Sequence, residues 1–177
     1  MMLRLFGLVL VAGACTWLSI GVAARGADTP PGALQTAAPN DDVATQPCPL
    51  PPRFRDAFER AARETELPLA LLVSVARVES NLRVRARSDA GALGLLQVMP
   101  ATARELGLDV DHPPSNVLAG ARYLRLMFDR FDSMDLALAA YNAGPTAVEK
   151  AGGAPGAETL TYVANVTKLW RRLNGCS

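Results

Sequence analysis

The sequence is built around residues 67–82, LPLALLVSVARVESNL. Pro68 suits the first turn of a helix, where its missing N–H has no intrahelical partner to lose. Leu72, Val75 and Ala76 recur at three- and four-residue spacing, which predicts a helix with one buried face. We therefore expect one helix over residues 67–82 at the centre of a mostly α-helical domain.

Glu79 continues this apolar face, because it follows Ala76 by three residues and Val75 by four. A carboxylate buried without a partner is costly, and the usual relief is protonation through a raised pKa. Such a group can act as a general acid near neutral pH. The alternative is that the helix frays after Val78 and that Glu79 is a solvated end residue. Glu79 is therefore a candidate catalytic acid whose role depends on the rest of the chain.

The composition describes an ordinary globular protein. The chain has 177 residues, half of them hydrophobic, with 18 Lys and Arg residues against 17 Asp and Glu residues. That length fits one domain with an additional N-terminal segment. The balanced charge argues against a dedicated nucleic-acid-binding protein, which would carry a basic patch. The single histidine, His112, and three scattered cysteines match no zinc-ligand spacing, so we interpret His112 as structural or incidental and expect no metal.

Residues 1–24 are expected to target the protein for export. Arg4 precedes the uncharged residues 5–24, which end in small residues suited to a signal peptidase. An uncharged run of about 20 residues is also long enough for a membrane anchor. Cys15, which follows Ala-Gly-Ala, forms a weak lipoprotein-type site. All three alternatives place the domain outside the cytoplasm, and we expect the periplasm.

Residues 25–52 are expected to form a disordered linker, because they are rich in Pro, Ala, Gly, Thr and Asp and lack periodicity. The folded domain is therefore expected over residues 53–177. Cys48 and Cys176 stand near its two ends. In an oxidising compartment they can form a disulfide that closes a loop of about 128 residues, and two free thiols are the alternative.

Hydrophobic patterns predict further helices over residues 53–64, 100–106, 117–131, 135–142, 146–151 and 158–173. The helix that runs to residue 131 is expected to be capped by Ser115 or Asn116. Residues 83–99 break the helical pattern, and their glycines allow at most a short β-hairpin. The domain is thus mostly α-helical and long enough for one core.

Three polar clusters interrupt the apolar pattern after the candidate acid. Gln97 lies between apolar neighbours in a Gly-containing loop, where it would either present its amide to a ligand or face solvent. A helix C-cap accounts for Asn142 and Gly144 but leaves Tyr141 unexplained. Tyr162 lies near an apolar stripe, and its hydroxyl needs a partner, as it would in an ordinary tyrosine at the edge of a core.

These clusters belong to an ordered set of motifs. The set comprises Glu79-Ser80, Ser88, Gly91-Ala92-Leu93-Gly94-Leu95-Leu96-Gln97-Val98-Met99-Pro100, Asn116, Gly120, Tyr123-Leu124, Ala140-Tyr141-Asn142-Ala143-Gly144-Pro145, Glu158-Thr159 and Tyr162-Val163. In order and spacing it resembles the catalytic domain of the soluble lytic murein transglycosylases, family 1 of the lytic transglycosylases, which has a goose-type-lysozyme-like fold. The resemblance covers residues 54–173. The chain departs from the family at Leu96, where Met is usual, and at Leu82, where an aromatic residue is common.

The resemblance implies a lytic transglycosylase that cleaves the MurNAc-β-1,4-GlcNAc bond of peptidoglycan without water and leaves a 1,6-anhydroMurNAc end. It implies that Glu79 is both acid and base and that no cofactor takes part. It also implies that the substrate-binding cleft is lined by Ser88, Gln97, Tyr141, Asn142 and Tyr162. In this cleft Ser88 and Tyr162 would hydrogen-bond near the acid, and Gln97 and Asn142 would bind acetamido and hydroxyl groups of the glycan.

The expected partners are peptidoglycan glycan strands and a cell-envelope-spanning machine for secretion or conjugation, with no nucleic acid and a monomeric state. Three alternatives remain open: a wall-binding assembly scaffold with an idle site, a lysozyme-type hydrolase and a chitin-cleaving enzyme. A hydrolase generally needs a second carboxylate, for which spacing does not exclude Asp89.

Overall fold

The computed structural model describes residues 46–177. The predictions of an export segment, a membrane anchor, a lipidated Cys15 and most of the linker lie outside the described residues. Within the described part, seven helices and no strand are found, which confirms the mostly α-helical fold. The helices are α1 (Pro52–Thr65), α2 (Leu69–Ser80), α3 (Pro100–Glu105), α4 (Pro113–Arg130), α5 (Met134–Ala143), α6 (Pro145–Ala151) and α7 (Ala157–Leu173). None of the helices described here is long and apolar enough to span a membrane.

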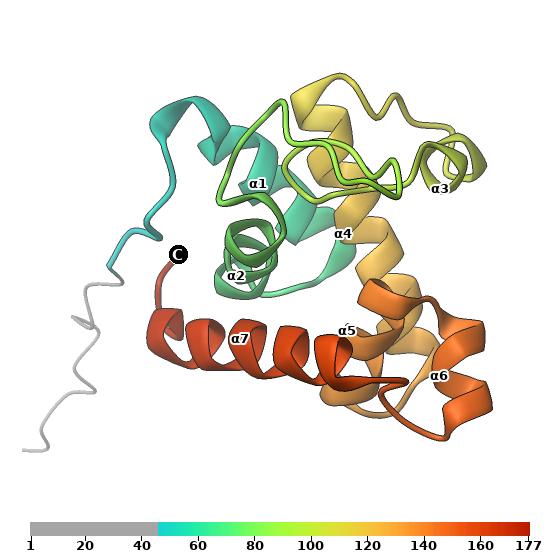
Figure 1. Cartoon of the computed structure of the whole chain (residues 1–177). Helices are drawn as coiled ribbons and strands as arrows, with labels where there is room; N and C mark the ends of the chain where they lie inside the picture. Colours follow the sequence, from blue (N-terminus) through green and yellow to red (C-terminus); the bar gives the residue numbers. More distant parts are fainter. Residues whose placement is uncertain (1–45) are drawn as a thin grey trace, which may run out of the picture. The chain divides into compact units, whose positions relative to one another are not determined.

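Helix α2 lies at the centre of the domain. Every residue from Ala70 to Ala76 is buried, so this part of the helix is covered on all sides and not only on the one face that the sequence predicted. It packs between α1 and α7, and Figure 1 shows it end-on between these two helices. The helix begins at Leu69, one residue after Pro68, which occupies the N-cap position. The predicted central helix is therefore confirmed, with slightly shorter bounds.

The end of α2 is a tight left-handed turn. Asn81 and Leu82 have φ angles of 51° and 59°. The Leu82 N–H donates to the Ala76 carbonyl at 3.4 Å, closing the last turn in the manner of a Schellman motif. The Ser80 hydroxyl donates to the Leu95 carbonyl at 2.8 Å, which ties the helix end to the following loop. Glu79 is thereby held in the last turn of a rigid helix.

The prediction for the start of α4 is wrong. Neither Ser115 nor Asn116 caps the helix, because α4 already begins at Pro113 with His112 in the N-cap position. Proline is well suited to this first turn, since the N–H it lacks would be unpaired there in any case. The Asn116 side chain instead bonds to a distant loop. The other predicted helices agree with the structure to within two residues.

The two ends of the described chain are joined. Cys48 and Cys176 form a disulfide with a Cα–Cα distance of 4.7 Å. The Cys48 N–H donates to the Ser177 carbonyl, and the Ser177 N–H donates to the Gln46 carbonyl, each at 3.2 Å. Cys48 and Leu50 are buried, so the expected linker is corrected at its C-terminal end: this segment packs on the domain because the disulfide and the Leu50 side chain hold it there.

Candidate active site

The loop of residues 81–99 is anchored on α4 by one buried side chain. The Oδ1 atom of Asn116 accepts a hydrogen bond from the Leu96 N–H at 3.0 Å. Its Nδ2 atom donates to the carbonyls of Leu93 at 2.8 Å and Val110 at 3.2 Å. Gly94 lies directly over this amide, and a Cβ atom there would come within 2.5 Å of Nδ2. Glycine is therefore required at this point of closest approach.

The same loop packs on two helices through Leu96. A Cβ atom at Gly120 of α4 would come within 2.5 Å of the Leu96 side chain, so only glycine admits this contact. The Tyr141 hydroxyl of α5 donates to the Leu96 carbonyl at 2.7 Å. Gln97 follows with a φ of 45°, and its Nε2 atom donates to the Gly94 carbonyl at 2.9 Å. Such left-handed backbone costs a non-glycine residue about 1–3 kcal/mol and is common at functional sites.

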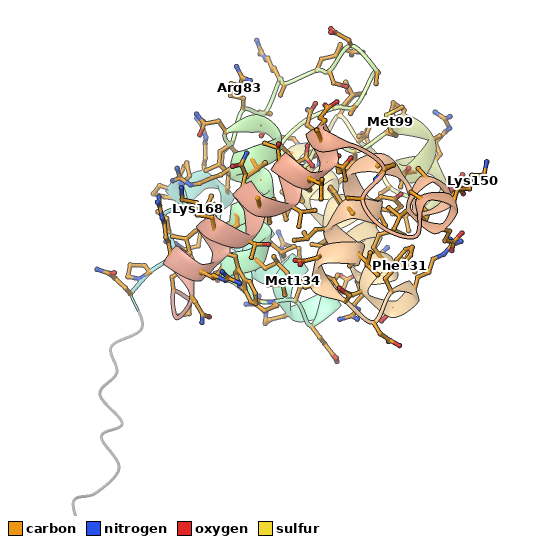
Figure 2. All side chains as sticks on the ribbon, turned by 60° about the horizontal axis from the view of Figure 1, so that its bottom comes forward. Arg83, Met99, Phe131, Met134, Lys150 and Lys168 are labelled. Atoms are coloured by element: carbon orange, nitrogen blue, oxygen red, sulfur yellow. A yellow bond between two sulfur atoms is a disulfide. The ribbon has the colours of Figure 1, made fainter. Side chains whose placement is uncertain are left out.

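A cleft of about 530 Å³ lies between this loop, α5 and the start of α7. Five of the six predicted catalytic and glycan-binding residues line it: Glu79, Ser88, Gln97, Tyr141 and Asn142. Met99 also lines the cleft and is exposed, and Figure 2 shows it where the loop meets α3. The cleft is thus lined by residues of α2, α3, α4, α5 and α7 and of the loop of residues 81–99, and Glu79 is among them.

Glu79 is half-buried, and burial raises the pKa of its carboxyl group to about 7. A smaller interaction with the Tyr162 hydroxyl opposes this by lowering the same pKa. A fully solvated end residue would not be desolvated in this way, so the fraying interpretation is wrong. Near neutral pH the carboxyl group can both give and take a proton.

Tyr162 lies behind the acid rather than in the wall of the cleft. Its side chain is buried, and its hydroxyl approaches Glu79 without reaching the geometry of a standard hydrogen bond. No other partner for this hydroxyl is found within residues 46–177. Burial and the nearby carboxyl group raise the pKa of Tyr162 well above 10, so the phenol keeps its proton at neutral pH. A small rotation would allow it to donate to the ionised acid.

Tyr141, Asn142 and Ser88 have structural partners that limit what each can offer a ligand. The Tyr141 hydroxyl donates its proton to the Leu96 carbonyl, so it has no proton left to give a ligand. The Asn142 Oδ1 atom accepts from the Thr159 hydroxyl at 3.0 Å, which leaves the amide N–H groups as donors. The Ser88 hydroxyl accepts from the Ala92 N–H at 3.0 Å, and its own proton remains available to a ligand.

Two further cleft residues had no role assigned from the sequence. Glu158 lies exposed in the first turn of α7, and its side chain lines the cleft. Tyr123 of α4 lines it as well, with its ring centroid 5.4 Å from that of Tyr141. Both residues belong to the set of motifs quoted from the sequence, and no other feature of the sequence indicated a role for them. Within residues 46–177, no group of three His, Cys, Asp or Glu side chains is placed to hold a metal ion.

A half-buried carboxyl group with a pKa near 7 thus lies at one side of a polar cleft in a small helical domain, an arrangement suited to proton transfer. The model of the transglycosylase SLT domain family matches residues 56–161. The chain belongs to this family.

Similar proteins include the transglycosylase of Enterobacteria phage PRD1, which is 36% identical over 118 residues, or 66% of this chain and 43% of the phage protein. The membrane-bound lytic murein transglycosylase F of Cellvibrio japonicus is 35% identical over 108 residues, or 56% of this chain and 22% of that protein. Among solved structures, an inactive mutant of the lytic transglycosylase Slt from Pseudomonas aeruginosa matches with a TM-score of 0.60 and 30% identity, covering 70% of this chain and 25% of that one. The chain therefore spans between about a fifth and two fifths of the length of these relatives.

Proposed function

We propose that this protein is a peptidoglycan lytic transglycosylase that acts in the periplasm with Glu79 as its acid and base. The observation that carries the proposal is the half-buried carboxyl group of Glu79, whose pKa is about 7, beside a cleft lined by polar and aromatic side chains. Family membership supports the same substrate, because several similar proteins, including those of Cellvibrio japonicus and Escherichia coli, are named as lytic murein transglycosylases.

In the first step, protonated Glu79 donates its proton to the glycosidic oxygen, and the bond from that oxygen to C1 of MurNAc breaks. The 2-acetamido group of the sugar stabilises the cationic centre, so the step does not require a second carboxylate from the protein. A carboxyl group whose pKa lies near the working pH is well matched to this proton transfer.

In the second step, the C6 hydroxyl of the same MurNAc attacks C1 and transfers its proton to ionised Glu79. A 1,6-anhydro ring forms, no water is consumed and the acid is restored. Because the attacking hydroxyl belongs to the sugar itself, the reaction benefits from intramolecularity once the ring is held in place. In this proposal, Gln97 and Asn142 address the acetamido and hydroxyl groups, and the ring of Tyr141 packs on the glycan.

The first test compares the release of soluble fragments from purified murein by the unmodified protein and by Glu79→Gln. This substitution keeps the size and neutral hydrogen bonding of the protonated acid but cannot transfer its proton. We expect fragment release to fall by at least about a hundredfold, as for the loss of a general acid. Unchanged release would show that this carboxyl group is not the catalyst. Binding to murein without any release by the unmodified protein would favour the assembly scaffold.

A role beside a secretion or conjugation machine remains a prediction of the sequence analysis. It is testable by affinity capture of the exported protein from cell envelopes with the site blocked by Glu79→Gln. Recovery of a defined envelope complex is the expected result, and recovery of murein alone would contradict it.

A further inference from the structure

Met99 is the most exposed sulfur-containing residue among residues 46–177. Its exposed fraction is 42%, whereas Met127 is 4% exposed and Met134 is half-buried. Both cysteines in the same part of the chain, Cys48 and Cys176, are already joined in a disulfide. The described chain therefore holds no free thiol, and the thioether of Met99 is its most accessible oxidisable sulfur.

Met99 also lies where a modification would alter the cleft. Three large apolar side chains are exposed in the described part of the chain, namely Met99, Leu126 and Leu160. Of these three, only Met99 lines the cleft that contains Glu79. A ligand in the cleft would cover apolar surface of Met99 that otherwise faces water, and this favours binding.

The backbone on both sides of Met99 is held in place. The Val98 N–H donates to the Leu93 carbonyl, and the Leu93 N–H donates to the Val98 carbonyl, each at 3.0 Å. The Met99 carbonyl accepts from the Ala103 N–H at 3.1 Å, in the first turn of α3. Pro100 restricts the residue before it to extended backbone, and Met99 has a φ of −67° and a ψ of 136°. A chemical change of this side chain is therefore not relieved by a movement of the backbone.

We propose that Met99 is a site of reversible oxidation to the sulfoxide by peroxide, and that the oxidised protein binds murein less tightly. This inference rests on the proposed function, because it takes the cleft as the binding site for murein. In the reaction, the sulfur lone pair attacks one oxygen of hydrogen peroxide and the O–O bond breaks. The sulfur keeps that oxygen and loses two electrons, and the other oxygen leaves as water with both protons of the peroxide.

The sulfoxide changes what Met99 offers a ligand. Oxidation converts a flexible apolar side chain into a polar one that carries an acceptor oxygen. Covering this oxygen with a ligand costs free energy unless a donor replaces the water that it binds. The favourable apolar contact is reduced at the same time. Oxidation therefore lowers the affinity of the cleft and leaves the carboxyl group of Glu79 in place.

The first measurement follows the oxidation itself and needs no substrate. Folded protein that carries Glu79→Gln is treated with limiting hydrogen peroxide, and peptide mapping by mass spectrometry locates each added oxygen. We expect Met99 to be oxidised severalfold faster than Met127 and Met134, because oxidation of methionine follows exposure. Figure 2 shows Met99 and Met134 at separate places on the domain, so the two can be oxidised independently. Oxidation of Met134 ahead of Met99 would overturn the proposal.

The second measurement compares the affinity for purified murein before and after peroxide treatment, by sedimentation of the same Glu79→Gln protein. Met99→Leu is added in one variant, because leucine has a similar volume and no sulfur. Met134→Leu is the matched control, since it removes a methionine outside the cleft. Each protein is compared with its own untreated sample. Because no cleavage is measured, failure of the proposed activity and failure of this inference can be told apart.

We expect peroxide to lower the affinity of the parent and of the Met134→Leu control by about fivefold, the scale expected for one partly exposed apolar contact. The affinity of the Met99→Leu protein should not change, and a methionine sulfoxide reductase should restore the parent. An equal loss of affinity in the Met99→Leu protein would overturn the proposal. So would full affinity of a parent in which Met99 is completely oxidised. Thermal unfolding before and after treatment checks that the fold is retained.

Discussion

At the residue scale, the candidate site depends on the environment of one carboxyl group. Glu79 occupies the last turn of a buried helix and is itself half-buried. Burial raises its pKa, while the Tyr162 hydroxyl favours the ionised form. Together these opposing effects place the pKa of Glu79 near 7. Each effect can be tested by its own substitution, Glu79→Gln for burial and Tyr162→Phe for the hydroxyl.

The raised pKa of Glu79 has a cost in stability. The carboxyl group has a pKa of 4.5 when unperturbed and about 7 in the folded chain. Between these values the folded protein holds a proton that the unfolded chain has lost, so the free energy of unfolding falls as the pH rises, and the cost is complete above about pH 7. We expect Glu79→Gln to remove this dependence and to raise the free energy of unfolding near pH 8 by as much as about 3 kcal/mol.

Denaturant unfolding between about pH 4 and pH 8 measures the difference. Glu158→Gln is the matched control, because this acid lines the same cleft but is exposed. The interpretation fails if both substitutions change the pH dependence of unfolding equally.

Tyr162→Phe tests the opposing effect on the acid. Loss of the hydroxyl removes the interaction that lowers the pKa of Glu79, so this pKa should rise further. Activity that needs the protonated acid decreases as the pH rises through its pKa, and this decrease should therefore move to higher pH. Because the hydroxyl has no other partner among the described residues, the fold should lose less than about 1 kcal/mol.

The measurement is the pH profile of murein fragment release. Tyr123→Phe serves as the control, since it removes a hydroxyl from the same cleft without a contribution to the pKa of Glu79. Identical profiles for Tyr162→Phe and the unmodified protein would contradict the assigned role.

At the element scale, the shape of the cleft depends on the attachment of the 81–99 loop to α4. Asn116 makes three hydrogen bonds to buried backbone groups. We expect Asn116→Ala to lower the free energy of unfolding by about 3 kcal/mol, at about 1 kcal/mol for each lost bond. The loop that carries Gln97 would then be less well held, so KM for murein fragments should rise.

Urea unfolding and fragment-release kinetics check this pair of effects. Asn165→Ala on the exposed face of α7 is the control and should change neither quantity. A stable Asn116→Ala protein with unchanged kinetics would show that the loop holds its shape without this amide.

The same loop shows which features the sequence could reveal. The helices were predictable because their periodicity is local, and Glu79 stood out as a carboxyl group on an apolar face. The role of Asn116 was not predictable, because the backbone groups that it binds lie up to 23 residues away in the sequence. An asparagine at this position is also typical of a helix cap. The placement of Tyr162 behind the acid, rather than in the cleft, depends on how α7 packs on α2, which no local pattern contains.

At the scale of the whole molecule, the Cys48–Cys176 disulfide joins the two ends of the described domain across a sequence separation of 128 residues. By chain entropy such a link is worth about 4–5 kcal/mol. We expect Cys48→Ser with Cys176→Ser to lower the melting temperature of the oxidised protein. Neither cysteine lines the cleft, so fragment release at low temperature should be retained.

Calorimetry with and without a reductant provides the check. Reduction should destabilise the unmodified protein and leave the double variant unchanged. Equal melting temperatures for the unmodified and double-variant proteins under oxidising conditions would show that the disulfide adds nothing to stability.

The proposed reaction differs from hydrolysis in what attacks C1 of MurNAc when the glycosidic bond breaks: the C6 hydroxyl of the same sugar, or water. The most direct measurement is mass spectrometry of murein fragments released in water enriched in the heavy oxygen isotope. We predict fragments that end in 1,6-anhydroMurNAc, lighter by one water than hydrolysis products and free of the isotope. Reducing ends that carry the heavy oxygen would contradict the account and identify a lysozyme-type hydrolase.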